Sequence, residues 1–451
     1  MSDSPTCLPI SHCQAASGAS PGQVTAGQRM MWLLDHYQGR HGALNCPVVL
    51  AFHGPLDVPR LQRAWDTVVQ RHEALRTGFI GRGSLLQRVI VPHRPSHWTI
   101  EPLSVGGDVS DVSDLRMQAA LREELRRPVS MAGPCHRVRL WRLHAALHVL
   151  CINQHHLVTD AVSCALVSKE LGFAYDGLPL EPVTWQFDDH VRNEQSWLTG
   201  ADAQRSRGFW ETALRGSRPL DLPRRAGVAP ATAGDAGDTI SFHRAALSKS
   251  VIGALEQQAR ACHTSLFVWL LALFKLHLHR LTGGHDLSVG TLLSNRAHPL
   301  SGTTVGFLAN MVVLRSLVES GTSLPVLARQ MRDTTAAAVA HQRWPYQLLP
   351  AGLVSAETAR EVVFQLFSRP THAMQTADLD VRMVDPPDGV ARRFDLDLVV
   401  MPGDVAHQVV LAASDRRFSR RWSHAFLEGY LALLHHAASD SAQPIQEVDN
   451  A

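Results

Sequence analysis

The hydrophobic pattern changes period along the chain, and it predicts helices and strands mixed in both halves. Apolar side chains recur every three or four residues from Leu61 onward, where Asp57 and Pro59 supply a helix cap and a first turn. A period of two over 136–143 and 147–156 predicts the strands of a hairpin. The same patterns predict further helices over 25–37, after Asp160, and over 247–261, 265–281, 334–342 and 419–438, with strands over 45–53, 286–293, 305–315, 361–367 and 396–401.

Strands and helices do not alternate strictly, so the predicted fold class is α+β with two lobes. The strongest linker signal is the Gly- and Pro-containing segment 176–182. We therefore expect a disordered Ser-, Pro- and Gly-rich lead-in over 1–24, an N-terminal lobe over 25–180 and a C-terminal lobe over 181–451. A Gly-, Pro- and Ala-rich segment over 215–238 predicts a surface loop.

Composition and charge exclude several classes of partner. The 451 residues carry 43 Lys and Arg against 41 Asp and Glu, which gives a net charge of +2. This charge is too small to create the positive potential that would attract nucleic acid or an anionic membrane to the protein as a whole. The longest apolar run, 266–274, is half a membrane span, and the N-terminus lacks the features of a signal peptide. The seven cysteines show no metal-knuckle or redox spacing, which favours reduced thiols. We expect a cytoplasmic protein.

The sharpest local candidate for chemistry is the segment from His155 and His156 to Asp160. A histidine at a strand end with a carboxylate four residues later is a sensible proton-accepting site. Adjacent strand residues point to opposite faces, so only one of the two histidines faces a given cleft. The same spacing recurs from His435 to Asp440 at the end of the last predicted helix, where histidines are favourable for the helix dipole. Asp160 also has a purely structural interpretation, as the cap of the helix that follows it. Spacing alone leaves both interpretations open.

Metal chemistry has no comparable candidate. His277 and His279 lie on a predicted helix, but no carboxylate stands at ligand spacing from them. We therefore predict no metal site.

Seven short segments stand in a fixed order along nearly the whole chain. They are Ala26–Trp32 (AGQRMMW), Arg71–Phe79 (RHEALRTGF), His155–Ala161 (HHLVTDA), Phe187–His190 (FDDH) followed by Phe209–Trp210, Asn295–Arg296 followed by Val305–Arg315 (VGFLANMVVLR), His341–Tyr346 (HQRWPY) and Arg393–Leu398 (RFDLDL). In this order they resemble the motifs of condensation domains of nonribosomal peptide synthetases, although the fourth is poorly kept. Seven motifs in register make the resemblance specific.

The resemblance implies an architecture and a set of partners. It implies two chloramphenicol acetyltransferase-like lobes in a V-shaped pseudo-dimer, with a central tunnel open at both ends. Carrier proteins would deliver a thioester donor to one mouth and a nucleophile to the other. We expect a monomer with no cofactor of its own, whose substrates are carried on the phosphopantetheine of acyl or peptidyl carrier proteins.

The resemblance also implies roles for individual residues. His156 matches the catalytic second histidine of the HHxxxD motif, and His155 is expected to pack or hydrogen-bond on the other strand face. Asp160 matches a carboxylate that pairs with an arginine, here Arg296, to hold the loop in shape. Asn310 is expected either to contact substrate or to tie strands across the boundary between the lobes.

Three departures from the family pattern bear on these roles. Ala161 stands where the family has Gly. Two outcomes stay open: the methyl group is harmless if φ is negative there, or it narrows the tunnel beside His156. Val162 replaces a Trp, and Leu308 and Met311 replace an aromatic residue and a Thr in the fifth motif. Because the histidine and both ion-pair partners are kept, we expect activity.

The function implied is condensation in natural-product biosynthesis. A carrier-bound acyl or aminoacyl thioester would be joined to an amine or hydroxyl, giving an amide or an ester of an antibiotic-like secondary metabolite. No adenylation or carrier segment fits in the remaining length. We therefore expect a free-standing enzyme that meets its carriers in trans, unless the sequence is part of a larger synthetase.

Three alternatives share parts of this pattern. A coenzyme A-dependent acyltransferase of the same fold would match the second and sixth motifs less well. An epimerisation domain would carry a Glu just before Arg296, and residues 291–295 supply none. A non-catalytic recruitment module typically loses the histidine pair, which is intact here.

Overall fold

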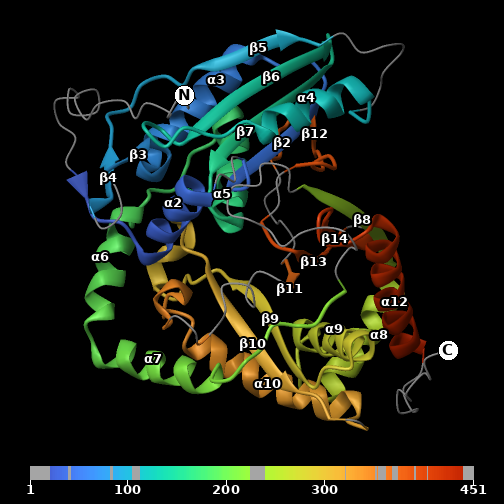
Figure 1. Ribbon diagram of the computed structural model, residues 1–451. Helices are drawn as coiled ribbons and strands as arrows, with labels where there is room; N and C mark the ends of the chain where they lie inside the picture. The colour runs from blue at the N-terminus through green and yellow to red at the C-terminus, as the bar shows by residue number, and fades with distance from the viewer. Residues whose placement is uncertain are drawn as a thin grey trace, which may run out of the picture. The chain divides into compact units, whose positions relative to one another are not determined.

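The computed structural model describes residues 21–38, 42–81, 85–103, 112–223, 239–319, 321–350, 353, 362–367, 374–390, 393–403 and 405–439. Strands and helices are mixed, so the predicted α+β class is confirmed (Figure 1). The chain forms two compact units. Unit 1 is drawn from Met1–Ser196, Arg296–Leu308 and Thr371–Val390, and unit 2 from Trp197–Asn295, Ala309–Pro370 and Ala391–Ala451.

These units differ from the predicted partition into 25–180 and 181–451. Unit 1 extends to Ser196, and two later segments return to it. One of them carries β12 (Asp380–Met383), which pairs with β2 (Asn45–His53). Most of the predicted lead-in, residues 1–20, lies outside the described residues. Residues 21–24 belong to unit 1, where β1 (Pro21–Gly22) pairs with β4 (Gln87–Ile90).

Unit 1 contains, in the part that the structure describes, a five-stranded sheet in the order β12-β2-β7-β6-β5 (Figure 1). The strands β2, β7 and β6 pair antiparallel, and β5 pairs parallel with β6. A smaller sheet has the order β1-β4-β3. The remaining elements of the unit are α2 (Ala26–Gln38), α3 (Val58–Arg71), the 3-10 turn η1 (Glu73–Arg76), β3 (Thr77–Ile80), β5 (Trp98–Pro102), α4 (Leu115–Arg126), β6 (His136–His144), β7 (Leu147–His155), α5 (Ala161–Tyr175) and the start of α6 (Phe187–Leu198).

Helices cover both faces of the larger sheet. Leu50 and Ile152 belong to the core that contains buried residues of α3 and α5, whereas Val49 and Cys151 belong to the core that contains buried residues of α4. Alternate residues of a strand face opposite sides, so a sheet covered twice buries every position. All nine residues of β7 are buried for this reason, and its last residue is His155. The predicted strand 147–156 therefore ends one residue early, and His156 lies in the following turn.

The second motif is fastened within unit 1. The guanidinium of Arg71 donates to Glu170 of α5 with an Nε–Oε2 distance of 3.0 Å. The ring of His72 lies 2.8 Å from the same carboxylate oxygen. The backbone N–H of Glu73 donates to the side chain of Gln186 at 3.3 Å. The charged residues of this motif therefore tie α3 to α5 and to the segment before α6.

Unit 2 contains a six-stranded sheet among its described residues, in the order β10-β9-β11-β13-β14-β8. The strand β11 runs parallel to β9 and β13, and the other pairs are antiparallel. The helices α8, α9 and α12 lie side by side along this unit (Figure 1). Its elements are α7 (Ala201–Ala213), β8 (Ile240–Ser248), α8 (Lys249–Ala261), α9 (Leu266–Thr282), β9 (Asp286–Leu293), β10 (Asn310–Leu317), α10 (Leu324–Ala340), η4 (Tyr346–Leu348), β11 (Val362–Leu366), β13 (Leu396–Met401), β14 (Ala406–Ser414) and α12 (Arg420–Ser439). The 3-10 turn η3 (Pro299–Thr303) belongs to unit 1.

Three predicted boundaries in the second half are corrected. Leu247 lies in strand β8, and α8 starts only after Ser248, which caps it by accepting from the N–H of Val251. The helix expected over 334–342 begins ten residues earlier, at Leu324, with Pro325 in its first turn. The strand expected from Val305 begins at Asn310, because side chains of unit 1 bind the backbone of the preceding residues. Of the predicted loop over 215–238, residues 224–238 lie outside the described residues.

The apolar run in α9 is buried. Its residues from Val268 to Leu278 are all buried, Lys275 included. Within the described part of the chain, no single helix is long and apolar enough to cross a membrane, and α8 with α9 meet that test only as a pair bent by 99°.

Lys275 is the one lysine of this apolar helix, and its side chain is fully buried. Its Nζ donates to the carbonyl oxygens of Leu287 and Leu314, at 3.2 and 2.6 Å, and to Oγ of Ser316 at 2.6 Å. Burial lowers the pKa of this ammonium to about 7, and the charge of Asp286 only partly opposes the shift.

The burial of Lys275 makes the stability of the wild type depend on pH. In the unfolded chain a lysine keeps its proton up to a pKa of about 10.4, whereas the folded protein releases the proton near pH 7. The free energy of unfolding should therefore rise, relative to that of Lys275→Met, as the pH increases from 7 to about 10. Urea denaturation across this range measures the difference, with Lys249→Met on an exposed position as the control. Parallel pH curves for wild type and Lys275→Met would contradict this account.

Candidate functional site

The imidazole of His156 is held by the turn that follows β7. Its backbone N–H donates to the carbonyl oxygen of Leu44 at 2.8 Å, and its Nδ1 lies 2.7 Å from the carbonyl oxygen of Thr159. A carbonyl oxygen only accepts, so Nδ1 carries the hydrogen of this bond. The neutral ring then has its basic lone pair on Nε2. This arrangement makes His156 suited to take a proton through Nε2.

His155 has the opposite hydrogen-bonding pattern. Its Nδ1 accepts the backbone N–H of Leu157 at 3.1 Å, so the proton of the neutral ring lies on Nε2. That Nε2 lies 3.9 Å from Oδ1 of Asp35. The basic lone pair of His155 therefore accepts a backbone hydrogen bond. The two neighbouring histidines thus differ in which ring nitrogen is basic, Nδ1 in His155 and Nε2 in His156.

Asp160 begins helix α5 and binds Arg296 at the same time. Its Oδ1 accepts the N–H of Ser163 at 2.8 Å, which caps the helix. The two terminal nitrogens of Arg296 donate to Oδ2 and Oδ1 at 2.9 and 3.0 Å. The N–H of Leu308 donates to Oδ2 at 3.1 Å. The family resemblance predicted the pairing of Asp160 with Arg296, and the structure places the two side chains in contact.

The charge of this pair is buried. The side chain of Arg296 is 7% exposed and that of Asp160 is 2% exposed. Burial alone would raise the pKa of Asp160, but the charge of Arg296 and the hydrogen bonds from Arg296 and Ser163 lower that pKa below its ordinary value. The carboxylate is therefore held ionised and accepts hydrogen bonds, which does not suit it to act as an acid.

The hydroxyl of Ser163 connects this ion pair to the segment 304–308. It donates to the carbonyl oxygen of Gly306 at 2.9 Å and accepts the N–H of Gly306 at 3.0 Å. It also accepts a hydrogen bond from Arg296 at 2.9 Å. Gly306 has a φ of +159°, and a Cβ atom there would lie 2.0 Å from Cδ2 of Phe187, so the position requires glycine.

Ala161 replaces the glycine of the family motif without backbone strain. It is the first residue of α5, it is exposed, and among the described residues only His263 and Asn295 combine a side chain with positive φ. The methyl group is therefore compatible with the local backbone.

Asn310 is bound by backbone groups of unit 2. Its Nδ2 donates to the carbonyl oxygens of Gln342 and Trp344, at 2.8 and 2.7 Å, and its Oδ1 accepts the N–H of Tyr346 at 3.1 Å. These three bonds hold the segment of the sixth motif beside β10. Contact of Asn310 with a substrate stays a prediction.

Sequence reasoning missed several groups of the site. Thr159, Ser163 and the peptide groups of Gly306 and Leu308 contribute the contacts described above. A backbone N–H or carbonyl has no sequence signature of its own. Ser163 carried a weak signal, because it stands three residues after a helix cap, where the N–H is bound by the capping side chain.

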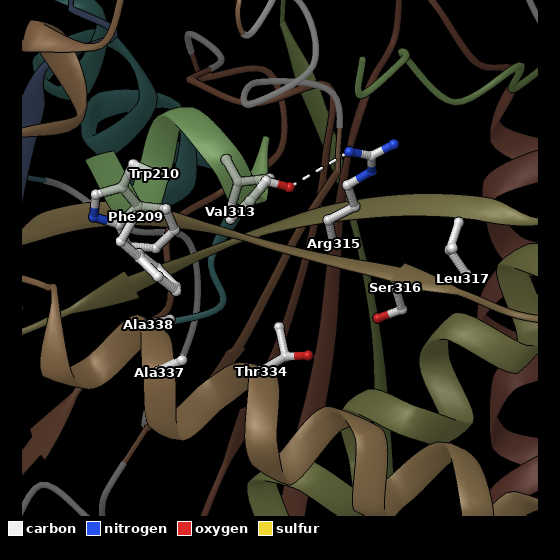
Figure 2. A pocket seen from close by; sticks show the side chains of 10 residues that line it. Phe209, Trp210, Val313, Arg315, Ser316, Leu317, Thr334, Ala337 and Ala338 are labelled. Carbon is white, nitrogen blue, oxygen red and sulfur yellow. Dashed lines mark hydrogen bonds between the residues drawn. The ribbon is translucent and has the colours of Figure 1, made fainter. Parts of the chain in front are cut away.

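Unit 2 contains a groove of about 380 Å³. Figure 2 shows Phe209 and Trp210 on one side of it, residues of β10 above and residues of α10 below. Arg315 is its charged lining residue, and Asp286 binds that guanidinium twice at 2.8 Å. The other polar side chains in the described lining are Ser316 and Thr334. This lining therefore pairs no base with a nucleophile, and it includes none of the predicted site residues.

The described residues contain no group of three or more His, Cys, Asp or Glu side chains that could hold a metal ion.

Comparison with known proteins assigns the family. The family model described as Condensation domain matches residues 22–451. This match covers nearly the whole chain, and the chain therefore belongs to the condensation-domain family, of the type found in nonribosomal peptide synthetases.

Individual relatives are more distant. The chain is 25% identical to tyrocidine synthase 2 of Brevibacillus parabrevis over 436 residues, which cover 94% of this chain and 12% of that protein. It spans less than a fifth of the length of such curated relatives.

Two solved structures share the fold. The first condensation domain of the calcium-dependent antibiotic synthetase, in complex with a substrate analogue, matches with a TM-score of 0.79 and 20% identity over 96% of this chain and 100% of that chain. The X-domain in the complex of the X-domain and OxyB from teicoplanin biosynthesis matches with a TM-score of 0.80 and 20% identity over 95% of this chain and 96% of that chain.

The buried ion pair predicts a specific loss of stability. Asp160→Asn leaves the charge of Arg296 buried without its partner, and the free energy of unfolding should fall by about 3–5 kcal/mol. The loss should shrink as the pH falls below about 4. The lowered pKa of Asp160 contributes its full stability above the unfolded pKa of about 3.9, and that contribution is lost as the pH falls further through the folded pKa. Urea denaturation of both proteins at several pH values measures this.

The control is Asp114→Asn. Asp114 caps α4 through the N–H groups of Arg116 and Met117, and Asn caps a helix equally well, so this change should be nearly neutral. An equal loss in the free energy of unfolding for Asp160→Asn and Asp114→Asn would show that the loss in Asp160→Asn does not come from the broken ion pair.

A second prediction concerns the departure from the family motif. Ala161→Gly should bring no gain in rate and should lower the free energy of unfolding by no more than about 1 kcal/mol, because glycine adds only freedom to the unfolded chain. Urea denaturation measures the stability, and product formation from an acyl thioester measures the rate. A large rise in rate would show that the methyl group of Ala161 obstructs the substrate.

Proposed function

We propose that this chain is a condensation enzyme. It joins a carrier-bound acyl or aminoacyl thioester to an amine or hydroxyl nucleophile, and it forms an amide or an ester in nonribosomal-peptide biosynthesis. The observation that carries the proposal is the hydrogen bond from Nδ1 of His156 to Thr159, which leaves the basic lone pair on Nε2 within an intact HHxxxD segment. Membership of the condensation-domain family supports it.

The reaction needs one proton acceptor and later one proton donor. The nucleophile attacks the thioester carbonyl carbon, and Nε2 of His156 takes the proton that the nucleophile loses. The tetrahedral intermediate then breaks its carbon–sulfur bond and expels the thiolate of the carrier phosphopantetheine. The imidazolium returns the proton to that sulfur, so the enzyme ends in its starting state.

The contribution of His156 depends on the nucleophile. An α-amino group has an ordinary pKa of about 7.7–8.0, so a fraction is already neutral at cellular pH. His156 then mainly orients the amine and accepts the proton as the bond forms. A hydroxyl is far less acidic, so the formation of an ester depends more strongly on the base.

The other predicted residues have supporting roles in this proposal. Asp160 and Arg296 hold the turn that carries His156, and neither transfers a proton. His155 binds the backbone of the same turn. Asn310 supports the segment 342–346.

Several features of the proposal come from the family resemblance alone. They are the V-shaped pair of lobes with its tunnel and the delivery of substrates by carrier proteins. The monomeric state and the cytoplasmic location stay predictions.

Two other functions are outcomes of the same test. A coenzyme A-dependent acyltransferase of this fold would use the same imidazole. A non-catalytic recruitment module would bind a partner protein, and the X-domain solved with OxyB shows that the fold occurs in a protein complex.

The test offers the purified protein an acyl-carrier protein or an acyl-coenzyme A, with an amine or a hydroxyl nucleophile, and weighs the products by intact mass. His156→Ala should reduce product formation from the carrier thioester by about 10²–10⁴-fold, with the larger loss for the ester. The control is His436→Ala, which belongs to the second His-His-x-x-x-Asp segment in α12 and should keep the wild-type rate.

Each alternative has its own outcome. Wild-type product formation by His156→Ala would contradict the assignment of the base. Product from acyl-coenzyme A alone would make the protein a coenzyme A-dependent acyltransferase. Absence of product from both donors would favour the recruitment module.

A further inference from the structure

An aromatic ring stands against the imidazole of His156. The ring of Phe307 contacts it edge to face, with a centroid distance of 4.9 Å and an interplanar angle of 68°. Both side chains are buried, each with 6% exposure. The hydrogen bond from Nδ1 to Thr159 holds one edge of the imidazole. A bond at that edge permits the ring to tilt about it, and the ring of Phe307 blocks the tilt on one side.

The backbone on both sides of Phe307 is bound to the buried ion-pair network. The preceding residue, Gly306, exchanges two hydrogen bonds with the hydroxyl of Ser163. The following residue, Leu308, donates its N–H to the carboxylate of Asp160. The position of the aromatic ring is therefore set by the same residues that begin helix α5.

Helix α2 bounds the aromatic ring on another side. A Cβ atom on Gly27 would lie 2.8 Å from Cε1 of Phe307, which is closer than real Cβ contacts. The neighbouring Gln28 donates to the carbonyl oxygen of Leu157 at 2.9 Å, in the turn that carries His156. The absence of a side chain at Gly27 thus provides the space that the ring of Phe307 occupies.

We infer that Phe307 is a positioning residue for His156. The ion pair of Asp160 and Arg296 acts on the chemistry through the two peptide groups that flank Phe307, and the ring of Phe307 keeps the imidazole aligned on the carbonyl of Thr159. This inference rests on the proposed function, because it assigns Phe307 to the base of that reaction. The geometry of His156 itself can be measured without any reaction.

The first experiment measures catalysis in three variants of Phe307 and Gly27. Phe307→Ala should lower kcat by about 10²-fold, as small misplacements of a catalytic group do, with a change in KM below about threefold. Phe307→Tyr keeps the ring and should recover most of that loss. Gly27→Ala should lower kcat when Phe307 is present. The double variant Gly27→Ala/Phe307→Ala should have the same kcat as Phe307→Ala, because no ring is left for the added methyl group to displace.

The matched control is Phe79→Ala. Phe79 is equally buried in the same unit, at 5% exposure, and among the described residues no ring contact or hydrogen bond joins it to His156. This variant should lose stability but keep the kcat of each folded molecule. An equal loss of kcat in Phe79→Ala and Phe307→Ala would show that Phe307 affects kcat only as any core residue does, and this result would overturn the inference.

The second experiment reads the imidazole directly. In protein labelled with ¹⁵N-histidine, the ring signals of His156, assigned by their loss in His156→Ala, should report a single Nδ1–H tautomer. In Phe307→Ala and in Gly27→Ala these signals should move toward the average of the two tautomers. Unchanged signals in both variants would overturn the inference, even if catalysis falls.

The two proposals fail in different ways. If His156→Ala keeps full activity, the proposed base is wrong, and the ¹⁵N signals still decide whether Phe307 aligns the ring. If His156→Ala is inactive while Phe307→Ala and Gly27→Ala match the wild type in kcat and in ¹⁵N signals, only the role of Phe307 is wrong. If Phe307→Ala does not fold, both kcat and the ¹⁵N ring signals of His156 are measured in Gly27→Ala, which adds only one methyl group.

Discussion

The carboxylate of Asp160 is the point on which the described site depends. It accepts hydrogen bonds from the N–H of Ser163, from the N–H of Leu308 and from both terminal nitrogens of Arg296. Removing either partner of a buried ion pair leaves an uncompensated charge, which costs far more than the pair contributes when intact. The pair therefore acts less as a source of stability than as a constraint that permits one arrangement of the helix start and the segment 304–308.

This constraint gives the His-His-x-x-x-Asp spacing a physical reason. The strand β7 ends at His155, and the turn that follows brings the carbonyl of Thr159 to Nδ1 of His156. Asp160 closes the turn by starting α5. The copy of this spacing at His435 and His436 lies in α12, where backbone carbonyls accept from N–H groups four residues later. Asp440 lies outside the described residues. Spacing alone therefore does not define the site.

Much of the fold could be predicted because local signals agreed with tertiary packing. The cap at Asp57, the proline in the first turn and the stripe of Leu61, Trp65 and Val68 all predicted α3, and the structure contains it. Helix α4 had a similar signal in Asp114, Met117, Leu121 and Leu125, but its many charged residues masked the stripe and it was not predicted. Strand β14 had no local signal in the sequence, because its residues are small or mixed in polarity. It forms a strand by pairing with its neighbours β13 and β8.

The site was predictable to a different extent. His156 and Asp160 are close in sequence, so their spacing pointed to them, but the partner Arg296 is 136 residues away and came only from the family resemblance. The peptide groups of Gly306 and Leu308 could not be predicted, because any residue supplies them and only the folded backbone brings them to Ser163 and Asp160. The predicted start of the next strand, at Val305, was wrong for the same reason, because that strand begins at Asn310.

The central claim is that Nε2 of His156 receives the proton of the nucleophile at a thioester carbonyl. A crystal structure of the protein with a stable amide analogue of an acyl-phosphopantetheine and a bound amine tests it most directly. The account predicts the amine nitrogen within about 2.6–3.2 Å of Nε2, with Nδ1 still on the carbonyl of Thr159. A productive pose in which the amine is bound elsewhere, with Nε2 facing away from both reactants, would contradict it.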